Sequence, residues 1–325
     1  MVANKAAARG VGLVATVVCI AVVAYLYLSV GLEEMDRETA AVIVHELRLP
    51  RLLCALGVGA LLSVAGALMQ GVFRNPLVEP YTMGISGGAV LGVAVAFTSG
   101  LVASLGGAAV TVGAALGGLA SLVVVLAMRR VAGGDVGAML MCGIMVSFVS
   151  SAATSILLSL GSREYVSQVF AWTVGSFAGV GWADGLAVFI VGCVATLLSV
   201  FAGNVLNVLS LGDDEARALG IRPERVAAVL FVVATLLAAL SVSVVGVVAF
   251  VGLAVPHFVR GLFGVDNRVV LPASGLVGAL VMLVCDFVSK VVVSPRELPA
   301  GAVCAVFGGC MFIYLALRWK RTSRL

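Results

Sequence analysis

Residues that could act as acids, bases or metal ligands are few in this chain, and only one of them lies well inside an apolar run. The chain has 16 Asp and Glu and 2 His among 325 residues, and the two histidines, His45 and His257, are far apart. Asp286, near the end of the apolar run 269–293, is the one carboxylate placed where a buried acid or base would have to be. No H-E-x-x-H, G-x-S-x-G or carboxylate–histidine cluster accompanies it. The sequence therefore predicts neither a catalytic residue nor a metal ligand.

The positions of the lysines show that the sequence has no phosphate-binding loop of the kind that ATPases use. The chain has three of them, Lys5, Lys290 and Lys320, and none follows a glycine, so a G-x-x-x-x-G-K-[ST] loop is absent. Any ATP hydrolysis must come from another polypeptide. We expect a chain that is not an enzyme and binds no cofactor of its own.

The composition indicates a membrane protein. Hydrophobic residues make up 62% and charged residues 11%, with a mean hydropathy of +1.19, whereas a soluble domain has about 25% charged residues. The pattern predicts one all-α domain over residues 1–325, a polytopic membrane protein of about ten transmembrane helices. The apolar runs are 11–30, 52–73, 82–98, 101–128, 136–160, 184–207, 225–246, 253–263, 269–293 and 299–318. Since 253–263 is too short to cross alone, a nine-span protein in which 225–263 crosses once and re-enters is the alternative.

The distribution of Lys and Arg predicts the orientation. With the N-terminus inside, the outside holds only Arg37, Arg48, Arg51, Arg163, Lys290 and Arg296 of the 20 basic residues. We expect both termini in the cytoplasm and a multi-pass protein of the cell membrane. The net charge of +4 reflects this topology, because no basic stripe with interleaved aromatic residues indicates nucleic-acid binding.

Two apolar runs end in similar interruptions. Asn75-Pro76-Leu77-Val78-Glu79-Pro80 follows the second run and Val251-Gly252-Leu253-Ala254-Val255-Pro256 follows the seventh; both contain Leu-x-x-Pro, and each is expected to precede a short helix. Spans 2–5 and 7–10 would then form two inverted four-helix blocks. Matched interruptions in two halves of a membrane protein indicate a transport path. Coincidence is the alternative, since Leu-x-x-Pro is common.

The segment 209–226, LSLGDDEARALGIRPERV, is the most polar stretch of the second half. Acidic residues followed by Arg217 predict a short helix over Leu211–Ile221, closed by Gly220. Its apolar patch would be Ala216, Leu219 and Ile221. The segment is either a solvated loop or a surface that a separate motor subunit could bind.

Taken together, these motifs resemble the FecCD-type family, the permease subunits of ABC importers for cobalamin, haem and iron-siderophores. The resemblance covers roughly 45–320. It rests on Arg48-Leu49-Pro50-Arg51, Gly66-Ala67-Leu68-Met69-Gln70, Asn75-Pro76-Leu77, Gly84-Ile85-Ser86-Gly87-Gly88-Ala89, Leu211-Gly212-Asp213-Asp214-Glu215-Ala216-Arg217-Ala218-Leu219-Gly220, Phe250-Val251-Gly252-Leu253, Pro256-His257-Phe258-Val259-Arg260 with Asp266 and Arg268, and Glu297-Leu298-Pro299-Ala300-Gly301.

The resemblance implies three sets of functional residues. ATPase coupling would involve Leu211, Gly212, Glu215, Ala216, Arg217, Leu219 and Gly220. The gate of the translocation path would involve Asn75, Pro76 and Leu77, with Val136 and Gly137 as a looser match. Docking of a binding protein through its glutamates would involve Arg48, Arg51 and Lys290, where the family often has Arg at the last position. From the residues alone, Pro76 could simply end its span, and the three basic residues could simply reach for headgroups.

The resemblance also implies the partners and the function. The chain would form a homodimer around a central path, with two ATPase subunits that bind ATP and Mg on the cytoplasmic side and an extracytoplasmic substrate-binding protein. Its cargo would be a metal chelate, namely an iron-siderophore, haem or cobalamin. The alternative is an ion-coupled secondary transporter without an ATPase partner, which would be expected to carry carboxylates or histidines at mid-membrane. This chain nearly lacks them.

Overall fold

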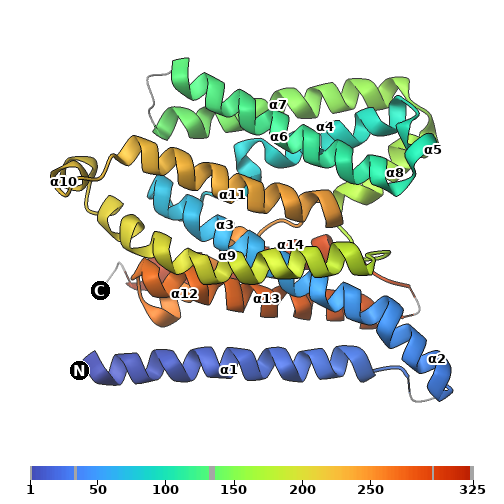
Figure 1. Ribbon diagram of the computed structural model, residues 1–325, viewed down its shortest axis with the longest axis horizontal. Coiled ribbons are helices and arrows are strands. Elements are labelled where there is room, and N and C mark those ends of the chain that lie inside the picture. Colours follow the sequence, from blue (N-terminus) through green and yellow to red (C-terminus); the bar gives the residue numbers. More distant parts are fainter. Residues whose placement is uncertain (1, 33–34, 132–135, 295, 323–325) are drawn as a thin grey trace.

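The computed structural model describes residues 2–32, 35–131, 136–294 and 296–322, and every regular element in these ranges is a helix (Figure 1). The helices are α1 Val2–Ser29, α2 Arg37–Val42, the π-helical η1 Ile43–Arg48, α3 Leu49–Phe73, the 3-10 helix η2 Pro80–Met83, α4 Ile85–Thr98, α5 Leu101–Leu105, α6 Gly107–Val131, α7 Val136–Leu160, α8 Arg163–Thr173, α9 Trp182–Leu209, α10 Asp213–Ala218, α11 Pro223–Val245, α12 Val251–Phe263, α13 Asn267–Val291 and α14 Ala300–Thr322.

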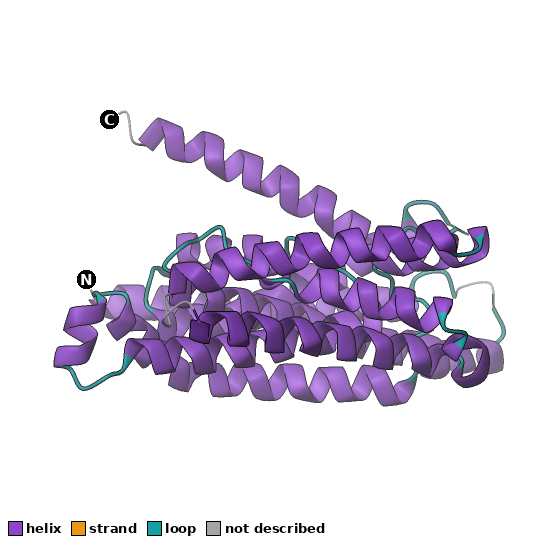
Figure 2. Cartoon of the chain, turned by 90° about the horizontal axis from the view of Figure 1, so that it is seen from above, coloured by secondary structure: helices purple, strands orange, loops and turns teal. Residues whose placement is uncertain are grey.

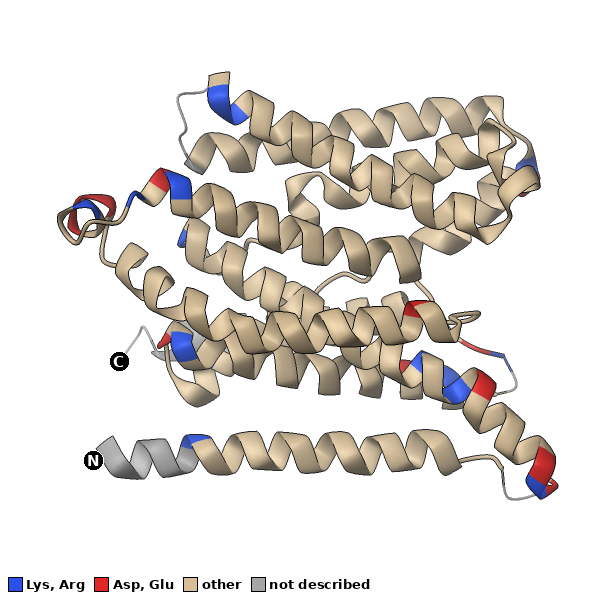
Figure 3. Ribbon diagram, in the orientation of Figure 1, with Lys and Arg blue, Asp and Glu red and all other residues tan. Residues whose placement is uncertain are grey.

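The long helices lie side by side along one axis, as expected of a bundle that crosses a membrane. In the described part of the chain, 7 helices are long and apolar enough to span it, and three shorter apolar helices lie at Ile85–Thr98, Val251–Phe263 and Ala300–Ile313. Charged residues gather at the two ends of the bundle and leave its middle apolar (Figure 3). Each predicted span overlaps one of these helices, so the all-α polytopic fold is confirmed and about ten is an approximate count.

Three local features differ from the sequence-based expectation. The predicted span 101–128 is two helices, because Gly106 has φ 61° and separates α5 from α6. The helices α2 and α8 were not expected, since their sequences are too polar to stand out as apolar runs. Toward the C-terminus, α14 leans away from the bundle (Figure 2).

Helix α3 is the centre of the packing. A Cβ on Gly66 would lie 1.9 Å from the carbonyl oxygen of Gly252 in α12, and one on Gly59 would lie 2.2 Å from that of Gly278 in α13. On another face, a Cβ on Gly57 would lie 2.6 Å from the backbone of Val188 in α9. Three neighbouring helices can therefore approach the α3 backbone closely, which is how small residues promote helix association in membranes.

The two four-helix blocks begin with helices that run in opposite directions, α3 and α11 (Figure 1). Each is followed by an irregular segment and a short helix. The first irregular segment starts at Arg74 with φ 49°, and the second runs from Gly246 to Phe250, whose φ is 70°. The predicted motif Leu253-x-x-Pro256 lies inside α12 rather than before it, so this part of the expected correspondence is wrong.

The two interruptions lie against each other inside the protein. The hydroxyl of Tyr81 accepts a hydrogen bond from the amide of Val248 at 3.4 Å, and the amide of Phe250 faces the carboxylate of Glu79. The side chain of Gln70 donates to the carbonyl oxygens of Gly252 and Leu253 at 3.3 and 3.2 Å. Backbone groups freed by one break are thus satisfied by the other half, as irregular backbone in a membrane requires.

Candidate functional site

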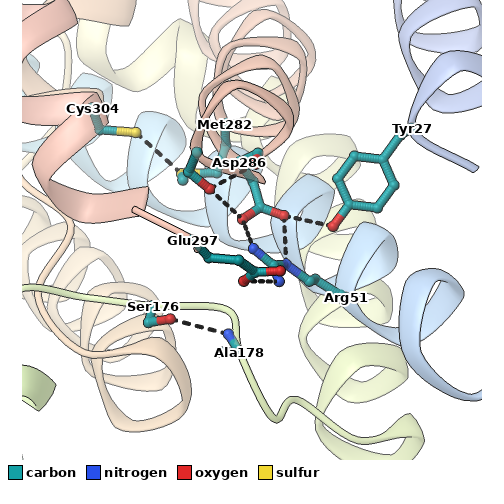
Figure 4. A network of polar contacts seen from close by, with 9 residues as sticks. Tyr27, Arg51, Ser176, Ala178, Met282, Asp286, Glu297 and Cys304 are labelled. Atoms are coloured by element: carbon teal, nitrogen blue, oxygen red, sulfur yellow. Dashed lines mark hydrogen bonds and ion pairs between the residues drawn. The ribbon is translucent and has the colours of Figure 1, made fainter. Parts of the chain in front are cut away.

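A buried polar network joins four segments at one end of the bundle (Figure 4). The guanidinium of Arg51 in α3 contacts both carboxylate oxygens of Asp286 in α13 and, at 2.6 Å, the carboxylate of Glu297. The hydroxyl of Tyr27 in α1 donates to Asp286 at 2.7 Å, and that of Ser289 donates at 3.3 Å. Asp286 is fully buried. The one acid that the sequence placed inside a span is therefore held in an ion pair, where a proton-transfer role would require breaking it.

Arg48 lies beside this network and closes the end of α1. Its Nη1 donates to the carbonyl oxygens of Tyr27, Leu28 and Val30 at 3.2, 2.9 and 2.8 Å. These carbonyls are left without helical partners at the end of α1, and a cation there also offsets the helix dipole. Lys290 Nζ lies 4.7 Å from the centre of the Tyr27 ring, a cation–π distance.

The structure thus brings together the three residues predicted to dock a binding protein, Arg48, Arg51 and Lys290, around Tyr27. Arg48 and Arg51 are only 7% and 9% exposed, and their hydrogen bonds are made within the chain. Arg48 and Arg51 therefore both stabilise the fold through contacts within the chain. Their role in docking stays a prediction. Sequence reasoning missed this pairing because Arg51 and Asp286 are 235 residues apart.

At the opposite end, the predicted short helix is present as α10, Asp213–Ala218. It starts after Gly212, whose φ is 138°, and the chain turns away at Gly220, whose φ is 81°, so the helix is shorter than the predicted Leu211–Ile221. The amide of Ile221 donates to the carbonyl of Ala216 at 2.9 Å, which closes the helix in the manner of a glycine C-cap. The acidic side chains of its first turn lie at the positive end of the helix dipole.

The outward face of α10 differs from the expected one. Ala216 is fully buried and packs toward the bundle, while Leu211 and Leu219 are 64% and 63% exposed. Ile221 is half-buried. The accessible apolar surface therefore consists of Leu211 and Leu219, and the expectation that Ala216 belongs to it is wrong.

Ion pairs tie α10 to its neighbours. Asp213 pairs with Arg74, which ends α3 and stands next to Asn75. Arg217 pairs with Glu224 at 2.5 Å and with Asp214 at 2.9 Å, and the hydrogen bond to Glu224 raises the pKa of Arg217 above its usual range. These ion pairs connect α10 both to Arg74, just before the first irregular segment, and to the start of α11.

The predicted gate residues lie beside this helix. The side chain of Asn75 accepts a hydrogen bond from the amide of Leu77 at 3.0 Å and so shapes the turn, while the side chain of Leu77 is 58% exposed. Asn75 and Pro76 border a cleft of about 290 Å³ that Gln70, Arg74 and Arg260 also line. This is the end of α3 that Arg74 connects to α10.

Val136 and Gly137, the second part of the predicted gate, begin α7. Among the described residues, Gly137 is not part of the lining of that cleft. The side chain of Val136 is outside the described part of the chain. About two turns farther along α7, a Cβ on Gly143 would lie 2.8 Å from the backbone of Met83, so α7 contacts η2 there. The structure therefore places Gly137 outside the cleft that Asn75 and Pro76 border, and a gate formed by both segments stays a prediction.

Comparison with known proteins agrees with this architecture. The model of the FecCD transport family matches residues 11–318. The chain is 34% identical over 276 residues to the hemin transport system permease protein HmuU of Yersinia pestis, covering 84% of this chain and 83% of that one. It is 36% identical over 285 residues to the iron(3+)-hydroxamate import system permease protein FhuB of Bacillus subtilis, covering 87% and 73%.

A solved structure of a metal-chelate type ABC transporter in an inward-facing conformation superposes with a TM-score of 0.86 at 28% identity, covering 94% of this chain and 98% of that one. The interrupted helices, the short helix α10 and the ion-pair network around Arg51 are thus features of a chain most of whose length matches such permeases. The resemblance indicated by the sequence motifs is confirmed, and the chain belongs to the FecCD transport family.

Proposed function

We propose that this chain is the transmembrane permease subunit of an ATP-driven importer of metal chelates. The observation that carries the proposal is the arrangement at the α10 end of the bundle. There, a short helix exposes Leu211 and Leu219 for a partner and is joined by the Arg74–Asp213 ion pair to the segment that begins the first interruption. An ATPase that moved α10 could therefore act directly on the residues proposed as the gate.

The orientation proposed for the bundle puts α10 and both termini in the cytoplasm, because most Lys and Arg residues of the loops lie at that end. Two ATPase subunits would bind there and supply the nucleotide and Mg. An extracytoplasmic binding protein would approach the other end, where Arg48, Arg51 and Lys290 surround Tyr27.

A second copy of the chain is the proposed partner within the membrane. On α7, Met141, Met145, Phe148 and Val149 are between 51% and 70% exposed, and on α14 Val306 and Phe307 are 69% and 51% exposed. Two copies that met through such surfaces would enclose a central path with apolar walls. A path of this kind suits a bulky chelate of the classes carried by haem and iron-hydroxamate permeases.

The ion-coupled alternative has little support in the described residues. Asp286 is saturated by Arg51, Tyr27 and Ser289, so the acid best placed for ion coupling is already neutralised. Coupling ions would need carboxylates that can change their protonation or ligation during transport.

Reconstitution distinguishes the two candidates. The permease, its ATPase and its binding protein are placed in liposomes, and uptake of haem, a ferric hydroxamate and cobalamin is followed with and without ATP. The proposal requires uptake of at least one chelate that needs ATP and survives collapse of the ion gradients by ionophores. Uptake that needs a gradient and proceeds without the ATPase would establish the alternative.

A further inference from the structure

A cleft lies between α6 and α11. None of its lining residues belongs to the proposed gate or to the proposed docking surface. It has a volume of about 350 Å³ and is lined by Leu126 of α6 and by Ala228, Val229, Val232 and Val233 of α11, with Arg129 and Arg130 at its rim. On α11, Val232 lies four residues after Ala228, and Val233 four residues after Val229, so the lining residues form one stripe of the helix.

The position of the cleft places it within one leaflet of the membrane. Val233 is ten residues into α11, which corresponds to about 15 Å from the start of the helix, half of a hydrocarbon core of about 30 Å. Val229 and Val233 are 61% and 40% exposed, so the cleft opens outward from the bundle. Its apolar lining on α11, from Ala228 to Val233, runs about 7.5 Å along the helix, enough to hold the first part of an acyl chain.

The rim of the cleft is cationic. Arg129 is half-buried and donates to the carbonyl oxygen of Glu224, whereas Arg130 is exposed and has no ion-pair or hydrogen-bond partner among the described residues. Arg225 stands three residues before Ala228 and four before Val229, so it extends the same stripe by one turn toward the end of the bundle. Glu224, whose carbonyl oxygen Arg129 contacts, already pairs through its carboxylate with Arg217.

Arginines at the end of a membrane helix often reach for headgroups without forming a site. Here three guanidiniums from two helices stand over a preformed apolar cleft, and this combination fits a molecule that has both an anionic head and acyl chains. We propose that the α6–α11 cleft binds a membrane phospholipid with an anionic headgroup, whose phosphate contacts Arg130 and Arg225 and whose acyl chain lies against Leu126 and Val232. Basic pockets between helices at the cytoplasmic surface are suited to such lipids.

The bound lipid would fill the gap between the end of α6 and the start of α11, next to the Arg217–Glu224 pair that connects α11 to α10. The proposal uses the orientation proposed above but is independent of the cargo. It also commits to a lipid rather than to free phosphate, which would leave the apolar part of the cleft empty.

The test measures lipid retention by the purified full-length permease in mixed nanodiscs of phosphatidylcholine and phosphatidylglycerol. Native mass spectrometry counts the retained lipids, and a thermal shift on adding phosphatidylglycerol reports their effect. We expect selective retention of phosphatidylglycerol. The variant R130Q/R225Q should lose it, with about a fivefold lower apparent affinity for each arginine removed, while the matched variant R37Q/R163Q at the other end should retain it.

A second variant separates a lipid site from mere surface charge. Ala228→Leu leaves every arginine in place but narrows the cleft, so it should also reduce retention, and size-exclusion chromatography checks that the variant is folded. Glycerol phosphate should not displace the lipid. The proposal is overturned if retention is the same in R130Q/R225Q, if glycerol phosphate competes, or if the variants lose only ATPase co-purification, since the rim would then belong to the ATPase interface. Because transport is not measured, failure here would leave the proposed function unaffected.

Discussion

Arg51 donates two hydrogen bonds to Asp286, from Nε to Oδ2 at 2.9 Å and from Nη2 to Oδ1 at 2.7 Å, and so joins the central helix α3 to α13. The pair is closed by Tyr27 on one side and Glu297 on the other, so α1 and the segment before α14 depend on it as well. A buried ion pair of this kind adds little over an apolar pair of the same shape, but it becomes costly when one partner is lost.

The first prediction follows from that asymmetry. Asp286→Asn should lower the stability of the permease by about 3–5 kcal/mol, because it leaves the charge of Arg51 buried with Glu297 as its only carboxylate. The double variant Arg51→Met with Asp286→Leu should recover much of the loss. Thermal unfolding in detergent measures both, with the exposed Arg163→Gln as a control. An Asp286→Asn variant that melts with the wild type would show that the pair is not structurally important.

The second prediction concerns docking of the binding protein. Arg48 and Arg51 are held by partners within the chain, so replacing either would also disturb the fold. Lys290→Glu is therefore the single change that tests docking with the least effect on stability. It should weaken binding by about two- to fivefold at low salt, as expected for one partly exposed ion pair, and the difference should shrink as salt is added. Lys290→Arg should bind as well as the wild type.

A triple variant replaces Arg48, Arg51 and Lys290 with glutamate. Its stability must be measured together with its binding, because two of these residues also stabilise the fold. Loss of binding at a temperature where the variant remains folded supports a docking role. Unaltered affinity of the folded triple variant at low salt would rule it out.

The third prediction concerns coupling to the ATPase. Leu211→Ser and Leu219→Ser should reduce both ATPase binding and transport while leaving the permease as stable as before, since both side chains are more than half exposed. Ala216→Leu should instead destabilise α10, because Ala216 is fully buried and a larger side chain overpacks its site. Co-purification with the ATPase, read beside the melting temperature, separates the two effects. Wild-type coupling in the double variant Leu211→Ser/Leu219→Ser would mean that this surface of α10 does not contact the ATPase.

Ala216 is buried and Leu219 is exposed, although the sequence predicted both to be part of one exposed apolar patch. This difference shows which features could not be predicted from the sequence. Hydropathy located the spans, because apolar runs of helical length are a local property. Gly220 marked the end of the short helix, while its start was predicted two residues early, at Leu211 instead of Asp213. A helix of 6 residues is too short to reveal its buried face. The break at Gly106 was missed because no charge or proline interrupts the apolar run. Arg51 and Asp286 could not be paired, since nothing local in either segment indicates the other.

The fourth prediction is a dependence on pH at the start of α13. Asp266 accepts hydrogen bonds from Arg268 and from Asn207, and the pairing with Arg268 holds the pKa of Asp266 well below its usual range. A carboxyl group whose pKa is lowered on folding stabilises the protein above its unfolded pKa of about 3.9, and that contribution is lost as the pH falls further. The melting temperature of the wild type should therefore drop more between pH 6 and pH 3 than that of Asp266→Asn. Equal drops would show that the pair does not stabilise the fold.

The last prediction places the gate. Leu77 is exposed at the α10 end of the bundle and stands three residues after Arg74, which pairs with Asp213. If two copies close the path there, Leu77→Cys should cross-link between them, and the yield should change with the nucleotide bound to the ATPase. Asn75→Cys should cross-link less, because the Asn75 side chain turns back to the amide of Leu77.

The protein used for this cross-linking experiment must lack the exposed Cys19, Cys193 and Cys310. Val123→Cys on α6, which is 64% exposed, is the matched control and should not cross-link. If residue 77 cross-links in no nucleotide state, Pro76 only ends α3, and the same experiment moves to Gly137 at the start of α7.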